Sequence, residues 1–323
     1  TYVNNTNSTS LKALNKTLSL GKQLTGALYN ESFNLGNLEA EAFNFMSIDK
    51  EAYKGYKNGS LGLGYYSKPS QYSILDYLNQ TGKIKDRVFQ ISYTGDTNKS
   101  IVLDIGNMPS STNSYSFTNI TEPGFLAKYP NAWILNIYHL LRGQERELNS
   151  STYINQAAII DSTNNYIVAP KSYKEYFYNY LDPIFNTSCK FDKVEDGEII
   201  LCSDDVILGS IDSLTFLFSN TGYKYDAKDL FDRYDDSNYE FLIKFGNDNY
   251  WHLGVPFLKK YTTLFNADLK QIGFKGGDQI DYTAEWNEYQ ERYNKKFMNY
   301  LVVVGATALA AFLLLVIIFL IKA

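Results

Sequence analysis

The feature that most limits the fold of this chain is an uninterrupted apolar run near its C-terminus. Residues 301–321 read LVVVGATALAAFLLLVIIFLI and contain no charged side chain. As an α-helix this run is about 31 Å long, which matches the hydrocarbon thickness of a bilayer. A helix buried in a soluble core is rarely this long or apolar on every side. The sequence therefore predicts a single-pass membrane protein with a transmembrane helix over 301–321, a lipid bilayer as its partner, and all preceding residues on one side.

Aromatic residues are regularly spaced just before this run. Residues 277–300 predict a juxtamembrane helix, and one face of it carries Trp286, Tyr289, Tyr293 and Phe297. This stripe has two interpretations. The rings lie at the lipid headgroups or against the ectodomain, or they form a docking surface for other membrane or surface proteins.

The charge and the rare residues exclude several function classes. Lys and Arg total 30 against 35 Asp and Glu, which gives a net charge of −5 and no basic face for nucleic acid. His139, His252, Cys189 and Cys202 lack the paired spacing of a zinc site, so we expect neither a metal nor a cofactor. His252 is interpreted as a packed or hydrogen-bonded side chain.

The two cysteines point to the compartment. Cys189 and Cys202 flank a predicted turn at 192–197, and two strands folded there would bring them within bonding distance. An oxidising compartment permits that disulfide, and a free buried pair is the alternative.

Glycosylation sequons point to the same compartment. The pattern Asn-x-Ser/Thr predicts a glycosylated ectodomain, extracellular or lumenal in the secretory pathway, cell surface or vacuole. Compositional drift is the alternative. The chain begins at Thr1 without a signal-peptide pattern, so we expect a mature or truncated product. The candidate acceptors are Asn4, Asn7, Asn15, Asn30, Asn58, Asn79, Asn98, Asn119, Asn149 and Asn186.

Short alternating apolar runs predict a mainly β fold. They are separated by Gly, Asn, Asp and Ser, which favour turns. Helical patterns are few, around 72–78, around 171–180 and near the C-terminus. The predicted strands lie at 88–93, 100–105, 132–137, 157–160, 199–201, 214–218 and 241–245.

Several segments resemble the pepsin-like aspartic proteases, in the family's order. Residues 158–170, AIIDSTNNYIVAP, resemble the strand-turn-strand around the second active-site aspartate. Residues 58–65 resemble the Gly-rich strand after the flap, and residues 73–89 resemble the helix and strand that follow it. Residues 250–261, YWHLGVPFLKKY, resemble the Trp-apolar-Leu-Gly signature, and residues 263–274 resemble the end of the C-terminal lobe.

This resemblance implies a bilobal β fold with a cleft between the lobes. It begins inside the N-lobe, so the first N-lobe strands are expected to be missing. Residues 1–130 would form a partial N-lobe and residues 131–276 the C-lobe. Asp161, followed by Ser162 and Thr163, would be the second catalytic aspartate.

The sequence departs from the family pattern where catalysis needs it most. Aspartic proteolysis requires two carboxylates that share a proton and activate water. The first 30 residues contain no Asp or Glu, so the first catalytic aspartate is absent ahead of the flap-like segment. Thr163 replaces the glycine of the Asp161 turn, where a β-branched residue is expected to crowd the carboxylate. The flap-like residues 19–22 include no tyrosine.

These departures favour a pseudoenzyme. The first hypothesis is a membrane-anchored pseudo-aspartic-protease with a vestigial Asp161, acting as a binding or structural subunit of a membrane or surface assembly. Its cleft would hold an extended peptide through strand-like recognition. The alternative is an active membrane-anchored aspartic endopeptidase whose first aspartate lies on a part missing from this chain. A third hypothesis places the fold in a mitochondrial membrane complex.

Overall fold

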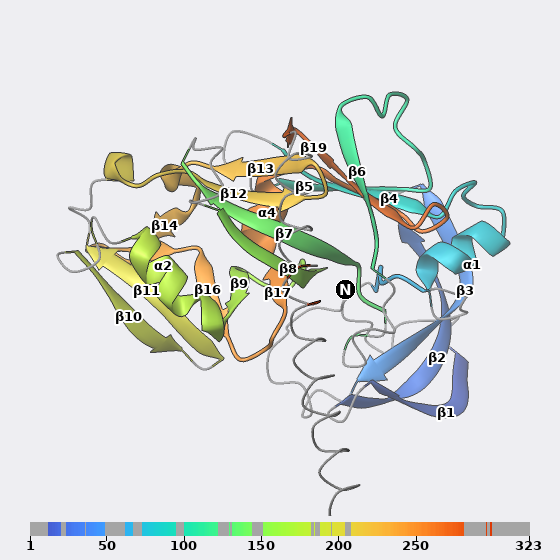
Figure 1. Cartoon of the computed structure of the whole chain (residues 1–323). Coiled ribbons are helices and arrows are strands. Elements are labelled where there is room, and N and C mark those ends of the chain that lie inside the picture. The colour runs from blue at the N-terminus through green and yellow to red at the C-terminus, as the bar shows by residue number, and fades with distance from the viewer. Residues whose placement is uncertain are drawn as a thin grey trace, which may run out of the picture.

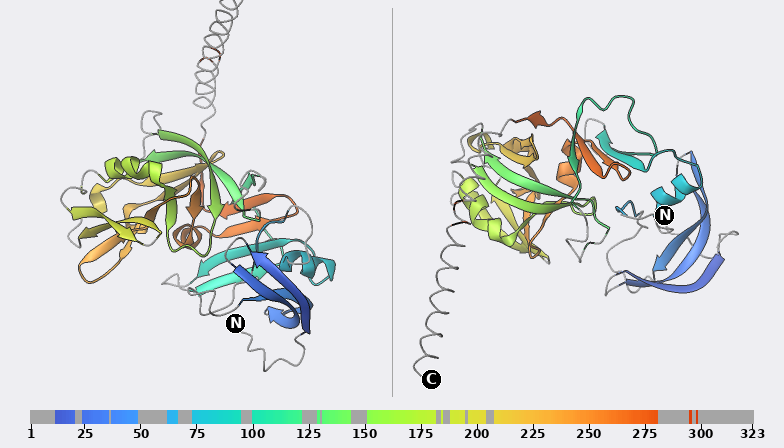
Figure 2. Two further views of the ribbon diagram at one scale, coloured as in Figure 1. Left: turned by 90° about the horizontal axis from the view of Figure 1, so that it is seen from below. Right: turned by 45° about the vertical axis from the view of Figure 1, so that its right-hand side comes forward.

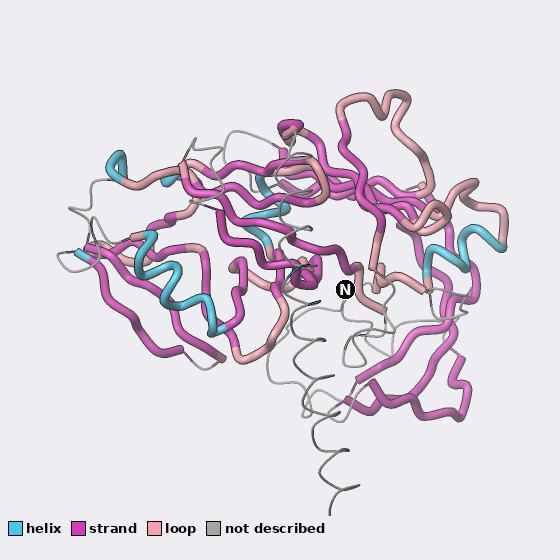
Figure 3. The backbone as a smooth tube through the Cα atoms, viewed as in Figure 1, coloured by secondary structure: helices cyan, strands magenta, loops and turns pink. Residues whose placement is uncertain are grey.

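The computed structural model describes part of the chain. The described ranges are 12–20, 24–35, 37–48, 62–66, 73–94, 100–121, 129, 131–143, 151–181, 184, 188–194, 196–203, 208–280, 295 and 298. Strands dominate these ranges and helices are short, as Figure 3 shows. The predicted mainly β fold class is therefore confirmed.

An N-terminal sheet forms from three consecutive strands. β1 (Lys12–Leu20), β2 (Leu24–Leu35) and β3 (Leu38–Ile48) pair antiparallel in that order. Helix α1 (Ile74–Gln80) packs against β3, with the rings of Phe43 and Tyr77 5.4 Å apart. Ser73 caps this helix by accepting a hydrogen bond from the Asp76 backbone N–H at 3.2 Å.

A second sheet joins strands from distant parts of the sequence. Its order is β5-β4-β18-β19-β6, with every neighbouring pair antiparallel. Figure 2 (right) shows this sheet between the N-terminal sheet and the rest of the molecule. The rings of Phe89 and Phe265 stack across β4 and β18 at 4.3 Å. The strands are β4 (Val88–Thr94), β5 (Ser100–Ile105), β6 (Tyr115–Asn119), β18 (Thr263–Asn266) and β19 (Gln271–Lys275).

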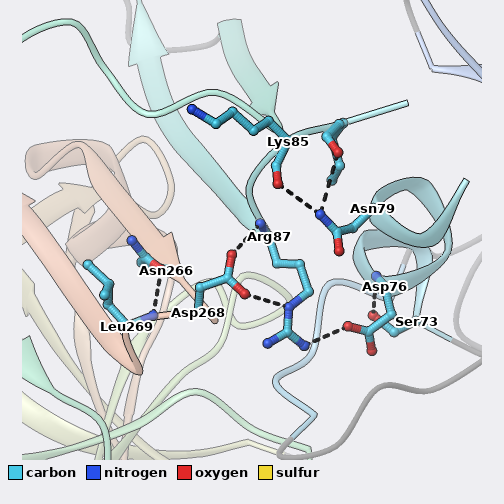
Figure 4. Close-up of polar contacts among 9 residues, drawn as sticks. Ser73, Asp76, Asn79, Lys85, Arg87, Asn266, Asp268 and Leu269 are labelled. Atoms are coloured by element: carbon cyan, nitrogen blue, oxygen red, sulfur yellow. Dashed lines mark hydrogen bonds and ion pairs between the residues drawn. The ribbon is translucent and has the colours of Figure 1, made fainter. Parts of the chain in front are cut away.

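Arg87 ties α1 to this second sheet (Figure 4). Its Nη1 lies 2.8 Å from Asp76 Oδ1, and its Nε lies 2.7 Å from Asp268 Oδ1 in the β18–β19 turn. The Arg87 backbone N–H also donates to Asp268 Oδ2 at 2.8 Å. β18 and β19 lie in the predicted C-lobe, but they belong to one sheet with β4, β5 and β6 of the predicted N-lobe. The lobe boundary between residues 130 and 131 therefore stays a prediction.

The largest sheet contains 12 strands in the described part of the chain (Figure 1). Its main path runs β14-β15-β11-β16-β9-β17-β8-β7-β12-β13-β20, and β10 pairs with β11. Its strands are β7 (Ile134–Arg142), β8 (Ser151–Ile160), β9 (Ile167–Pro170), β10 (Cys189–Val194), β11 (Gly197–Ser203), β12 (Leu214–Phe218), β13 (Thr221–Tyr225), β14 (Phe231–Arg233), β15 (Asn238–Phe241), β16 (Ile243–Gly246), β17 (Trp251–Leu253) and β20 (Asp278–Gln279).

An aromatic core fills the space between this sheet and its helices. Fully buried Trp251 contacts the rings of Tyr173, Phe177 and Phe216 at centroid distances of 5.1–6.3 Å. Aromatic pairs at such distances add stabilisation beyond the burial of their area. The helical segments are η2 (Lys171–Tyr173), α2 (Lys174–Tyr180), η3 (Leu208–Ser210), η4 (Ala227–Asp229) and α4 (Val255–Lys260).

The predicted strands are mostly confirmed, with three differences. The run 241–245 is interrupted at Leu242, so it belongs to both β15 and β16. Residues 62–66, within the Gly-rich segment, form no strand. The meander β1–β3 has no counterpart among the strands expected from periodicity alone.

The predicted transmembrane segment 301–321 lies outside the described residues. The same holds for most of the juxtamembrane segment 277–300, including Trp286, Tyr289, Tyr293 and Phe297. Within the ranges that are described, no helix is both long and apolar enough to span a membrane.

Candidate functional site

The Asp161 turn connects β8 to β9 and crosses the end of β17, the strand that lies between them. β17 lies between β8 and β9, parallel to β8 and antiparallel to β9. The connection from β8 to β9 therefore passes over the C-terminal end of β17. Two backbone hydrogen bonds fix it there: Asp161 N–H donates to Leu253 O at 3.1 Å, and Val255 N–H donates to Asn164 O at 2.7 Å.

Gly254 is required at this crossing. A Cβ atom placed on it would lie 2.1 Å from Tyr166 O and 2.4 Å from Asn164 O. Both are backbone atoms that cannot move aside without displacing the turn, so a side chain at 254 would push the Asp161 turn off β17. Close backbone approach of this kind is a common reason for a glycine.

The Asp161 carboxylate is held by its own turn. Its Oδ1 accepts hydrogen bonds from the Thr163 N–H at 3.1 Å and from the Thr163 hydroxyl at 2.6 Å. Thr163 is not among the residues with positive φ. The expectation that Thr163 crowds the carboxylate is therefore wrong, because its branched side chain points a hydroxyl donor at Asp161.

The second oxygen of Asp161 faces a histidine. His252 Nδ1 lies 3.2 Å from Asp161 Oδ2, and His252 Nε2 lies 3.4 Å from Asp248 Oδ2. The Tyr129 hydroxyl donates to the same Asp248 oxygen at 2.6 Å, and its ring meets the imidazole edge-on at 5.6 Å. The interpretation of His252 as a packed, hydrogen-bonded residue is confirmed.

These contacts set the ionisation of Asp161. Burial alone raises the pKa of the carboxyl group, but hydrogen bonds from His252 and Thr163 outweigh that cost and hold the pKa below its ordinary value. The side chain is 23% exposed, so Asp161 is a partly accessible, ionised carboxylate at neutral pH.

The described residues bring no second carboxylate into direct contact with Asp161. A carboxylate offers about four acceptor positions, and Thr163 and His252 fill three of them. Asp248 is reached only through the imidazole. This arrangement can accept a hydrogen bond from a ligand, but it does not place two carboxyl groups around one water.

Of the other predicted site residues, Ser162 lies in this turn, whereas Cys189 and Cys202 lie elsewhere in the same sheet. Ser162 follows Asp161 and is exposed. His139 is buried in β7, where burial lowers its pKa. Cys189 and Cys202 face each other on β10 and β11 and form a disulfide, which confirms that prediction. No group of three or more possible metal ligands occurs among the residues that the structure describes.

Two sequon asparagines have described side chains. Asn79 at the end of α1 uses its Nδ2 to donate to the carbonyls of Ile84 and Lys85, as Figure 4 shows for Lys85. Asn119 on β6 is exposed, and its recorded side-chain hydrogen bond uses Oδ1. Asn15 and Asn30 are described only as part of strands β1 and β2. The remaining candidates, which lie outside the described residues, are Asn4, Asn7, Asn58, Asn98, Asn149 and Asn186.

Sequence reasoning missed Asp248 and Tyr129. Asp248 lies four residues before His252, but the loop between β16 and β17 has no periodicity that would relate their side chains. Tyr129 is 119 residues from Asp248, and nothing in the sequence pairs them. Only the fold brings these groups to the Asp161 turn.

The strand order and the aspartate turn define a pepsin-like aspartic protease fold. A family model described as eukaryotic aspartyl protease matches residues 1–276, so the chain belongs to this family. The chain is also similar to pregnancy-associated glycoprotein 1 of Sus scrofa. The two are 24% identical over 288 residues, which cover 84% of this chain and 69% of the relative.

Proposed function

We propose that this chain is a membrane-anchored member of the aspartyl protease family that binds ligands without cleaving them. The observation that carries the proposal is the state of Asp161. Its acceptor positions are largely filled by Thr163 and His252, and no other described carboxylate contacts it. A single ionised carboxylate lacks the shared proton that activates water in this mechanism.

Acid peptidase activity tests this proposal. The full chain in detergent micelles would be incubated with a mixture of peptides between pH 3 and 7, with and without an inhibitor that mimics the tetrahedral transition state. We expect no cleavage that the inhibitor abolishes. Inhibitor-sensitive cleavage that is lost in Asp161→Asn would refute the binding role and favour the enzyme.

The alternative is an active aspartic endopeptidase completed by another polypeptide. Membership of a protease family and a partly exposed, ionised Asp161 favour it. A second aspartate from an upstream or separate segment would then have to approach Asp161 Oδ2. The genomic sequence upstream of Thr1 decides whether an Asp-Thr/Ser-Gly motif exists, and co-expression of such a segment should restore activity if this alternative is right.

We further propose that the ectodomain lies outside the cell or in the lumen of the secretory pathway. Two observations support this location: the disulfide between Cys189 and Cys202, and the match of the chain to the eukaryotic aspartyl protease family. Glycopeptide mass spectrometry should find glycans, with Asn119 occupied before Asn79, whose nitrogen already donates to backbone carbonyls. Bare asparagines throughout would favour the mitochondrial alternative.

Anchoring through residues 301–321 and docking through the aromatic stripe complete the proposal. Alkaline carbonate extraction of membranes should leave the full chain in the pellet and release a chain truncated after residue 280. Replacing Tyr289 and Tyr293 by Ala should release a membrane or surface partner, but not the bilayer, if the stripe docks a protein. Retention of every co-purifying protein would assign the rings to the headgroup region instead.

A further inference from the structure

The imidazole of His252 lies between two carboxylates from different segments. Asp161 follows β8 and reaches Nδ1 at 3.2 Å, while Asp248 in the β16–β17 loop reaches Nε2 at 3.4 Å. The His252 side chain is only 9% exposed, whereas the Asp161 and Asp248 side chains are 23% and 29% exposed. A nearly buried ring therefore connects two partly accessible acids.

The sheet register explains why the imidazole faces Asp161. His252 pairs with Ile159 on β8 and with Val168 on β9. Paired residues on neighbouring strands share a face, so His252 points to the same side as Ile159. β8 ends at Ile160, and the next residue, Asp161, meets the imidazole at that end of the strand. An apolar side chain at 252 would fill this position without offering a donor.

The two imidazole contacts differ in kind. Nδ1 forms a hydrogen bond with Asp161 Oδ2 and is its donor, because an ionised carboxylate only accepts. Nε2 approaches Asp248 Oδ2 at 3.4 Å. Tyr129 adds a hydroxyl donor to Asp248 and does not compete for the imidazole. Asp161, Asp248 and Tyr129 are the titratable groups recorded against the ring within the described ranges, and they come from three separate segments.

We propose that His252 is a positioning residue that holds the Asp161 carboxylate through Nδ1–H and ties the Asp248 loop to the Asp161 turn. The inference rests on the proposed binding function, because it describes the same site. Asp161 Oδ2 then presents one remaining acceptor position, which suits a ligand N–H or a cation and is present at neutral pH.

A carboxyl titration tests the role of His252 directly. The full chain in micelles, labelled with ¹³C at the Asp carboxyl carbons, would be titrated by NMR from pH 7 to pH 2, with the Asp161 signal assigned by its loss in Asp161→Asn. In His252→Leu we expect the Asp161 titration midpoint to rise by about 1–2 pH units, because the carboxylate loses a hydrogen-bond donor that stabilises its charged form. His139→Leu is the matched control, since His139 is also a buried histidine but pairs with Tyr153, eight residues before Asp161.

A second variant, His252→Gln, keeps the inference testable if His252→Leu does not fold. His252→Gln keeps a polar side chain with an N–H donor but lacks the shape of the imidazole, so its Asp161 midpoint should lie between those of the wild type and His252→Leu. A midpoint in the folded variants equal to the wild-type value would overturn the inference and leave the proposed binding function standing. Inhibitor-sensitive peptidase activity in the wild type would refute the proposed binding function. It would leave the role of His252 standing, because the Asp161 titration midpoints would be unchanged.

Discussion

Arg87 is expected to contribute more stability than the exposed ion pairs in the described part of the chain. It is the recorded counter-ion of Asp76, whose side chain is only 3% exposed, and it also binds the half-exposed Asp268. Replacing Arg87 by Leu leaves the Asp76 charge buried without that partner, which costs about 3–5 kcal/mol. Asp268→Asn weakens a solvated pair and should cost about 1 kcal/mol.

Urea unfolding of the full chain in micelles measures both changes. With an m value of about 2–3 kcal/mol/M, Arg87→Leu should lower the urea midpoint by about 1–2 M. Arg142→Leu is the control, because the Arg142–Asp212 pair has the same 2.8 Å separation but is exposed. Adding Asp76→Asn to Arg87→Leu should recover part of the loss, since it removes the buried charge that Arg87 neutralises. A midpoint for Arg87→Leu no lower than that of Arg142→Leu would refute the reasoning.

Three further changes should have measurable effects. Gly254→Ala places a Cβ 2.1 Å from Tyr166 O and should destabilise the chain by about 1–3 kcal/mol in the same urea assay; an unchanged midpoint would contradict the close approach. Cys202→Ser opens a disulfide loop with a sequence separation of 13 residues and should cost about 3 kcal/mol, seen as a lower melting temperature that reducing agent does not lower further. Asp161→Asn should be less stable than the wild type at pH 7. Because folding lowers the Asp161 pKa below 3.8, its stabilisation is present above that pH and is lost as the pH falls through the folded pKa, so the two melting temperatures should converge near pH 2.

The strands of the largest sheet could be predicted because their periodicity and turn chemistry agree with the fold. The run Leu214–Phe218 is bounded by turn residues and is buried along its whole length as β12. The cysteines were predictable for the same reason, since a short hairpin puts positions on either side of its turn opposite each other. Local patterns suffice where an element and its partner are close in sequence.

The N-terminal meander and the network around His252 could not be predicted in this way. β1 to β3 contain polar residues such as Asn44 and Glu39 within long strands, which blurs the alternation that identifies a strand. Asp248, His252 and Tyr129 become neighbours only after β17 is inserted between β8 and β9. That insertion is a property of the strand order, and no local sequence window contains it.

The geometry of the Asp161 turn gives its aspartate a structural role. Its backbone N–H binds Leu253 O at the end of β17, and its carboxylate accepts two hydrogen bonds from Thr163. The first contact fixes the crossing of the turn over β17, and the second closes the turn. A side chain without an oxygen at this position, such as Ala, would leave the Thr163 N–H and hydroxyl without this acceptor. These contacts give Asp161 a structural role in the turn, so an aspartate at this position does not by itself argue for peptidase activity.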